Sequence, residues 1–121
     1  AASGGLALLV EDSDGLRASV RDMLIELGFS VIEATSADEA TALVADLPQI
    51  ALVLSDIRLQ GHGTGLDLLA RIAGTGPPCL LMTSLPPTDP LHRAALARAP
   101  VLRKPFAAAD LAALIPGEAR T

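Results

Sequence analysis

The segment LVLSDIR, at residues 52–58, is an apolar run that ends abruptly on a carboxylate. Its first three residues have the composition of a buried strand. Strands that end in loops usually give way to Gly, Pro or Asn, whereas this one continues through Ser55 to Asp56. Taken alone, Asp56 fits a helix cap, a solvated loop residue, a metal ligand or a nucleophile. The rest of the sequence decides among these four.

Length and composition indicate one domain over residues 1–121, which buries roughly two-thirds of its unfolded surface. No stretch approaches the ~18–20 consecutive apolar residues of a membrane span. The N-terminal segment lacks the basic flank of a signal peptide, and residues 1–5 are expected to be a flexible leader or a cloning remnant. Without a signal, the single Cys79 fits a reducing compartment, so a cytoplasmic location is expected.

The charge pattern argues against two classes of partner. The net charge is −5, the basic residues form no stripe that follows a phosphate backbone, and there is no Trp or Tyr to stack on bases. This domain is therefore expected to bind neither nucleic acid nor a membrane. The expectation concerns this domain alone and leaves a longer parent protein open.

Short apolar runs alternate along the chain with segments of helical periodicity. The predicted strands cover residues 6–10, 30–34, 51–55, 79–83 and 101–103. The first helix is predicted to end at Gly28, after a stripe of apolar side chains that comprises Leu16, Val20, Met23, Leu24 and Leu27. Ser36 and Glu39 form a capping-box pattern for the second helix, which ends at Pro48. Later helices are predicted over residues 66–73, over 91–99 and around 111–115.

This alternation gives five units of strand followed by helix. Three of the predicted strands are apolar along their whole length, which is typical of a parallel sheet covered by helices on both faces. Sheets of this kind bind ligands at the carboxyl ends of their strands. The residues at those ends are therefore the candidates for function.

Polar residues stand where the predicted strands end. They are Glu11 and Asp12 after the first strand, Asp56 after the third, Thr83 and Ser84 at the end of the fourth, and Lys104 after the fifth. Each has a simpler interpretation alone, such as a cap, a loop polar group, a strand former or a surface charge. Those interpretations would all have to hold together, each at a strand end, so we favour a shared site.

Three carboxylates at one edge repel one another unless a cation neutralises them. Mg²⁺ does so with oxygen ligands, typically one or two carboxylates together with waters and substrate oxygens. No Cys or His spacing indicates zinc, and His62 and His92 are interpreted as exposed polar residues in loops. A carboxylate beside Mg²⁺ attacks phosphorus, and the transferred group then needs a metal, an ammonium and a hydroxyl around its oxygens. The strand ends supply these groups, which predicts a phosphoryl-acceptor site.

Together these motifs resemble the CheY-like receiver domain of two-component response regulators over essentially the whole chain. The matching pieces, in order, are VED (10–12), LSDIR (54–58), the Gly65–Leu66 helix start, MTS (82–84) and LRKPF (102–106). The resemblance implies a flavodoxin-like, doubly wound (βα)5 fold of the α/β class. Its five-stranded parallel sheet has the order 2-1-3-4-5, with helices on both faces.

The resemblance also implies a role for each residue of the predicted site. Asp56 is the expected phosphoacceptor, and Lys104 is expected to contact the phosphoryl group. Mg²⁺ is expected to bind Asp12, Asp56 and the backbone carbonyl of Arg58, with Glu11 acting through water.

The switch residues follow the family pattern only in part. Thr83 is expected to swing toward the phosphoryl group, and Ser84 leaves space for its access. The family usually has Tyr or Phe three residues before the site lysine, but this chain has Val101, so no rotating ring reports phosphorylation. Family members often have a cis peptide before the residue that matches Pro105.

Two other departures concern loops near the site. The segment LQGHGTG has Gln60 where Pro is usual and is one residue longer than the common loop, as in receivers fused to hybrid histidine kinases. Arg58 and Leu85 flank the expected phosphoryl pocket and are expected to tune dephosphorylation in a direction that the sequence does not give.

The implied partner is a histidine kinase or a histidine phosphotransfer protein. A dimer through the face of the fourth helix, fifth strand and fifth helix is a further expectation. The chain is interpreted as a single-domain regulator, a relay intermediate or a receiver from a larger protein, and whether that parent is a histidine kinase stays open.

Two other functions compete with this one. Phosphatases with an aspartate nucleophile need an acid–base carboxylate two residues later, where this chain has Arg58. The chain is therefore expected to catalyse only its own phosphorylation and dephosphorylation. A phosphorylation-independent interaction module stays open as the alternative because of Val101.

Overall fold

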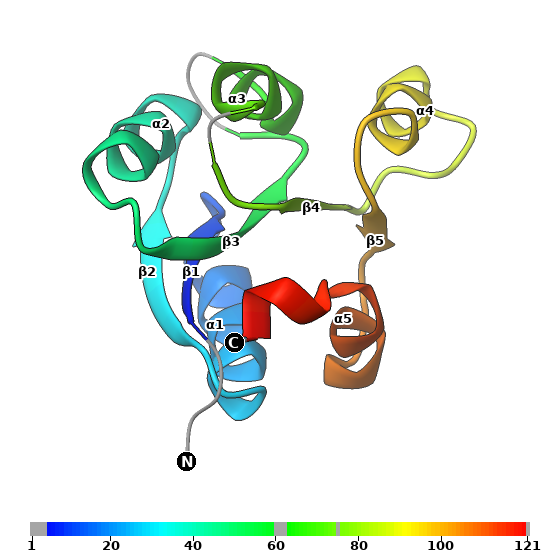
Figure 1. Cartoon of the computed structure of the whole chain (residues 1–121). Coiled ribbons are helices and arrows are strands. Elements are labelled where there is room, and N and C mark those ends of the chain that lie inside the picture. Colours follow the sequence, from blue (N-terminus) through cyan, green and yellow to red (C-terminus); the bar gives the residue numbers. More distant parts are fainter. Residues whose placement is uncertain (1–4, 60–62, 75, 121) are drawn as a thin grey trace.

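One parallel sheet organises the chain, with its strands in the order β2-β1-β3-β4-β5 (Figure 1). The computed structural model of the protein describes residues 5–59, 63–74 and 76–120. The strands are β1 Leu6–Val10, β2 Ser30–Ala34, β3 Ile50–Asp56, β4 Cys79–Thr83 and β5 Val101–Arg103. The helices are α1 Asp14–Glu26, α2 Ala37–Asp46, α3 Gly65–Ile72, α4 Pro90–Leu96, α5 Ala108–Leu114 and the short η1 Gly117–Arg120. The predicted flavodoxin-like fold and strand order are confirmed.

Helices cover both faces of the sheet, α1 and α5 on one side and α2, α3 and α4 on the other (Figure 1). Side chains of a strand alternate between the two faces. In β1, Ala7 and Leu9 join the core under α1 and α5, whereas Leu8 and Val10 join the core under α2 and α3. The centre of the sheet is therefore buried on both sides, which fixes the carboxyl ends of β1 and β3.

The boundaries of four strands agree with the sequence prediction, and the third strand is longer by one residue at each end. Asp56 is thus the last residue of β3 and pairs with Met82 of β4. The fourth helix ends at Leu96, not at Ala99 as predicted. Its last turn tightens because the ring of Pro100 disfavours helical geometry at the residue before it.

The predicted cap of the second helix is confirmed, since the Ser36 hydroxyl accepts a hydrogen bond from the Glu39 N–H at 3.1 Å. A second cap, formed by Thr64 and Asp67, begins α3. Caps of this kind satisfy backbone N–H groups that have no partner inside the helix. Both caps lie on the α2–α3 side of the sheet.

Several expectations concern residues outside the described ranges. They are the leader at residues 1–4, Gln60 and the length of its loop, and the exposure of His62. Within the described ranges, no helix has the length and apolar character needed to cross a membrane.

Gly65 begins α3 at a point where backbone approaches backbone. Its N–H donates to the Ile57 carbonyl at 2.8 Å, and a Cβ at this position would lie 2.4 Å from the Asp56 carbonyl oxygen. A methyl group does not fit against that rigid atom. Glycine is therefore required for α3 to pack against the end of β3.

We predict that Gly65→Ala lowers the free energy of unfolding by about 1–3 kcal/mol because the end of β3 and α3 must separate. Gly15→Ala is the matched control, since nothing lies within 4 Å of a Cβ there. In α1 that change should stabilise by roughly 0.5–1 kcal/mol. Urea unfolding of the three proteins measures both values, and equal stability of the two variants would contradict the packing argument.

Candidate functional site

Asp56 is held at the carboxyl end of the central strand β3. Its residue is 7% exposed, and its Oδ1 accepts a hydrogen bond from the Arg58 N–H at 2.9 Å. The strand ladder continues past it, because the Ile57 N–H donates to the Met82 carbonyl at 2.9 Å. The carboxylate is therefore rigidly placed and faces the edge at which the neighbouring strands also end.

Lys104 connects the ends of three strands. Its Nζ donates to Glu11 Oε1 at 2.9 Å and also to Asp56 Oδ2, although these residues are far apart in the sequence. The side chain of Lys104 is only 13% exposed. The structure thus brings together three of the residues that the sequence assigned to one site, with Asp12 half-buried beside Glu11 in the chain.

The site holds more negative than positive charge. Glu11 is 1% exposed, and this burial, together with hydrogen bonding to Asp56 and Asp12, raises its pKa to about 7 against the opposing effect of Lys104. For Lys104, burial lowers the pKa, but its hydrogen bonds to Asp56 and Glu11 outweigh burial and the net shift is upward. One ammonium therefore does not fully compensate the carboxylates around it.

Arg17 of α1 supports the site and was not found from the sequence. Its Nη1 donates to the Glu11 backbone carbonyl at 2.9 Å, while its other nitrogens contact Asp14 at 2.7 Å and Glu33 at 3.2 Å. The hydrogen bonds that Arg17 donates to the carboxylates of Asp14 and Glu33 raise its pKa above its ordinary value, and the one to Asp14 contributes most. Only the Asp14–Arg17 spacing of three residues was readable in advance, because the other contacts depend on the tertiary fold.

Thr83 ends β4 next to Asp56 and is 1% exposed. Its backbone carbonyl accepts from the Lys104 N–H at 2.8 Å, and its Oγ1 accepts from the Leu85 N–H at 3.0 Å. Ser84 is exposed beside it. Thr83 therefore ends the strand next to β3, whose last residue is Asp56.

Val101 is half-buried in a small cluster with Ile57, Leu81 and Ala95, on the side of the sheet that α4 covers. The residue is opposite Leu81 in the β4–β5 ladder. A β-branched side chain is short and restricted at χ1, so it does not rotate between an inner and an outer position as an aromatic ring can.

Two further details concern the same region. The peptide bond between Lys104 and Pro105 is cis, which confirms the expectation from the resemblance. The interpretation of His92 as an exposed loop residue is wrong, because His92 is 5% exposed and lies in α4. Sequence periodicity in this short helix did not show which side faces the sheet.

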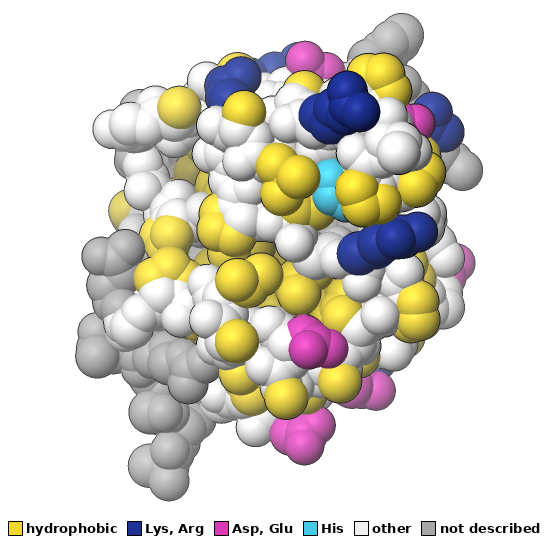
Figure 2. All heavy atoms as spheres, turned by 90° about the vertical axis from the view of Figure 1, so that its right-hand side faces the viewer, with side chains coloured by type: hydrophobic (Ala, Val, Ile, Leu, Met, Phe, Trp, Pro, Cys, Tyr) yellow, Lys and Arg dark blue, Asp and Glu magenta, His cyan; other side chains and the backbone are white. Residues whose placement is uncertain are grey.

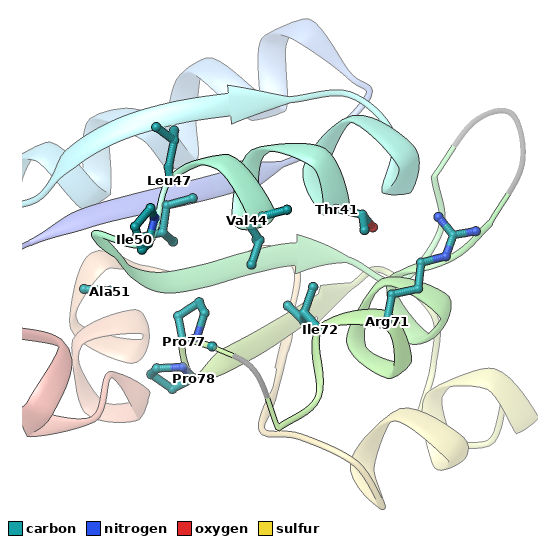
Figure 3. A pocket seen from close by; sticks show the side chains of 12 residues that line it. Thr41, Val44, Leu47, Ile50, Ala51, Arg71, Ile72, Pro77 and Pro78 are labelled. Atoms are coloured by element: carbon teal, nitrogen blue, oxygen red, sulfur yellow. The ribbon is translucent and has the colours of Figure 1, made fainter.

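A cavity of about 610 Å³ lies away from this site, between α2 and α3 (Figure 3). Its walls include Val44 and Leu47 of the α2 side and Ile72 and Pro77 across from them, with Arg71 at one end. Because it opens beside the amino end of β3, it is at the opposite edge of the sheet from Asp56. It takes no part in the carboxylate site.

The family model of the response regulator receiver domain matches residues 7–116. This match covers most of the chain and includes every residue of the site described above. The chain therefore belongs to the response regulator receiver domain family. This is a family of signalling domains of two-component systems, not of ordinary enzymes.

Solved structures show the same fold. The signal receiver domain of a modulated diguanylate cyclase from Desulfovibrio desulfuricans G20 is 32% identical, with a TM-score of 0.79 over 90% of this chain and 88% of the other. The receiver domain of an HD domain-containing protein from Pseudomonas fluorescens Pf-5 is 26% identical, with a TM-score of 0.77 over 90% and 89%. A CheX–CheY–BeF3–Mg²⁺ complex from Borrelia burgdorferi matches at 21% identity, with a TM-score of 0.76 over 89% and 84%. Among curated proteins, no relative is found by sequence.

The raised pKa of Glu11 predicts how stability depends on pH when no divalent cation is present. The ordinary value is 4.5 and the folded value is about 7, so between these values the folded protein binds more protons than the unfolded chain. The free energy of unfolding therefore receives a contribution of about 3 kcal/mol that is present below about pH 4.5 and is lost as the pH rises through about 7.

Glu11→Gln is the control for this prediction, since the amide keeps the size of the side chain and does not titrate. Urea unfolding at a series of pH values, with a chelator present, should show a steeper loss of stability with rising pH in the parent protein than in the variant. Parallel curves for the two proteins would show that Glu11 does not titrate in this range.

Proposed function

We propose that Asp56 accepts a phosphoryl group from a phosphohistidine of a histidine kinase or a histidine phosphotransfer protein. The observation that carries this proposal is the contact of Lys104 with both Asp56 and Glu11. It places an ammonium beside the buried nucleophile, where it can neutralise an oxygen of the transferred group. The Thr83 hydroxyl, at the end of the next strand, is the natural donor to another of those oxygens.

The transfer of the phosphoryl group needs no reactant besides the phosphohistidine and Asp56. An oxygen of the Asp56 carboxylate forms a bond to phosphorus as the bond from phosphorus to the donor nitrogen breaks, and the electron pair stays on that nitrogen. Water later cleaves the acyl phosphate and returns the carboxylate. The chain thus promotes only its own phosphorylation and dephosphorylation, with Arg58 and Leu85 beside the path of that water.

Mg²⁺ is the cofactor that fits these residues. The cluster offers oxygen donors with an excess of negative charge, which is the preference of a hard cation. In the described part of the chain, no three His, Cys, Asp or Glu side chains form a complete metal site. Mg²⁺ takes one or two carboxylates and keeps waters. Asp12, Asp56 and the Arg58 carbonyl would hold it directly, and Glu11 through water.

Mg²⁺ supplies positive charge at the phosphoryl oxygens when it is bound. The receiver from Borrelia burgdorferi, whose complex contains Mg²⁺ and BeF3, is similar in fold. We assign the same kind of chemistry to residues 7–116 of this chain, which the family model matches, in a cytoplasmic setting. Binding of a partner or a second copy at the α4–β5–α5 face is the proposed output.

Acetyl phosphate with Mg²⁺ tests the phosphoacceptor. The parent protein should gain the mass of one phosphoryl group, because Asp56 is buried beside Lys104 and is the best-placed nucleophile. Asp56→Asn should not gain it, and Asp22→Asn, which changes an exposed carboxylate of α1, should label like the parent. Intact-mass spectrometry under mildly acidic conditions follows all three proteins.

The outcomes separate the candidate functions. A label that persists in Asp56→Asn would place the acceptor on another residue. The absence of labelling in the parent, together with unchanged NMR spectra on addition of beryllofluoride and Mg²⁺, would instead support the phosphorylation-independent interaction module. Val101 is the observation that keeps that alternative in view.

A further inference from the structure

His92 holds a buried position on α4 that the site described above does not use. Its Nδ1 lies 2.9 Å from the Leu85 carbonyl oxygen. Since a carbonyl accepts and does not donate, this ring nitrogen carries the proton. The hydrogen bond ties α4 to the loop that leaves β4.

The backbone N–H of Leu85 is hydrogen-bonded to the side chain of Thr83, the expected switch residue. This N–H donates to Thr83 Oγ1 at 3.0 Å, and the Leu85 carbonyl accepts from His92. One residue thus connects the Thr83 side chain to the helix. Three groups in series, Thr83, Leu85 and His92, form a chain of hydrogen bonds that we call the Thr83–His92 relay.

Leu85 is a stiff connector. It precedes Pro86, whose ring disfavours helical geometry at the residue before it, so Leu85 has few backbone conformations. Pro86 and Pro87 are themselves fixed in φ. A displacement of the Leu85 N–H is therefore passed on to its carbonyl and is not absorbed by rotation within the residue.

The main chain of Thr83 is held in the sheet, whereas its side chain can rotate. Its backbone carbonyl is held by the Lys104 N–H at 2.8 Å in the sheet. Its hydroxyl accepts from Leu85, and among the described residues no acceptor is seen for the hydroxyl hydrogen. An anionic phosphoryl group on Asp56 would supply such an acceptor, and charge-assisted hydrogen bonds are the stronger kind.

We infer that His92 is the coupling residue through which the state of Thr83 reaches α4, in the place that an aromatic side chain at position 101 would otherwise take. The inference rests on the proposed phosphorylation of Asp56. When Thr83 turns toward the phosphoryl group, the Leu85 N–H loses its acceptor, Leu85 shifts, and the hydrogen bond to His92 shifts with it.

The consequence reaches the surface through α4. His92 is followed one turn later by Ala95, which is buried against Ile57, Leu81 and Val101. A shift of His92 therefore changes how α4 seats on this cluster. Leu96, 54% exposed, lies on the same helix, and the face of α4, β5 and α5 carries many hydrophobic side chains with basic and acidic ones among them (Figure 2).

The relay is tested first without any phosphate mimic. Thr83→Ala removes the acceptor of the Leu85 N–H and should move both the Leu85 amide resonance and the His92 ring resonances in nitrogen-15 NMR spectra. His62→Gln in every protein leaves one histidine to observe. Ser84→Ala, which changes the exposed neighbour, should leave the ring resonances in place. A Thr83→Ala spectrum that moves Leu85 but not His92 would overturn the relay.

The second arm uses beryllofluoride with Mg²⁺ and two variants of His92. His92→Asn keeps a donor near the position of Nδ1, whereas His92→Leu keeps volume and removes the donor. The Arg58 amide, which donates to Asp56, reports binding of the mimic. We expect it to move in all three proteins, while the shifts of α4 amides fall by about twofold or more in His92→Leu only.

These readouts keep two failures apart. If α4 shifts are the same in His92→Leu as in the parent while Arg58 moves in both, the coupling role of His92 is wrong and the proposed function stands. If Arg58 does not move in the parent, the proposed phosphorylation fails, and the Thr83→Ala spectra still decide on the relay. Should His92→Leu not fold, His92→Asn and Thr83→Ala carry the test.

Discussion

The charge balance at the carboxyl edge of the sheet is the constraint on which the rest of the structure depends. Glu11 and Asp56 are almost fully buried, and Lys104 provides the cation between them. Burial of unpaired carboxylates is costly, and in other folds such groups move to water. Here they stay, because β1 and β3 are packed on both faces and the loop after β1 is held by Arg17.

Because these strands are rigid, a change of charge at the site must be accommodated by its side chains. A proton, a metal ion or a phosphoryl group would each change the balance of charge at this edge. The closely packed strands cannot move far to compensate for that change. The side chains at the edge must rearrange instead. The Lys104 N–H donates a hydrogen bond to the Thr83 carbonyl, which fixes the main chain of both residues. A change of charge at Asp56 is therefore answered by movement of their side chains.

Most of the fold was predictable because its signals are local. An apolar run predicts a strand, and an apolar stripe of period 3.6 predicts a helix, from residues that are close in the sequence. Parallel topology then predicts that the carboxyl ends of the strands lie at one edge of the sheet. That Lys104 and Glu11 lie at the same edge of the sheet was predictable for the same reason, whereas their hydrogen bond was not predicted. Arg17 was not, because its acceptors Glu11 and Glu33 come together only after β1 and β2 have paired.

The errors around α4 have a common physical cause. The helix has seven residues, too few to show a clear apolar stripe, and it is rich in Ala, which favours helix without marking a face. The length was therefore overestimated, and His92 was placed outside. Its burial depends on how the segment after β4, which contains Pro86 and Pro87, leads into the helix, and this tertiary feature is not encoded in the periodicity of the helix itself.

The replacement at Val101 and the burial of His92 are connected through the packing of α4. Val101 packs in one cluster with Leu81 and with Ala95 of α4, and the same helix carries His92, whose Nδ1 lies 2.9 Å from the Leu85 carbonyl oxygen. An aromatic ring at position 101 would need more volume in that cluster than the valine side chain occupies. Under the proposed function, the chain keeps the phosphoacceptor chemistry of its family, while the inferred link from Thr83 to the surface rests on a hydrogen bond and not on a rotating ring.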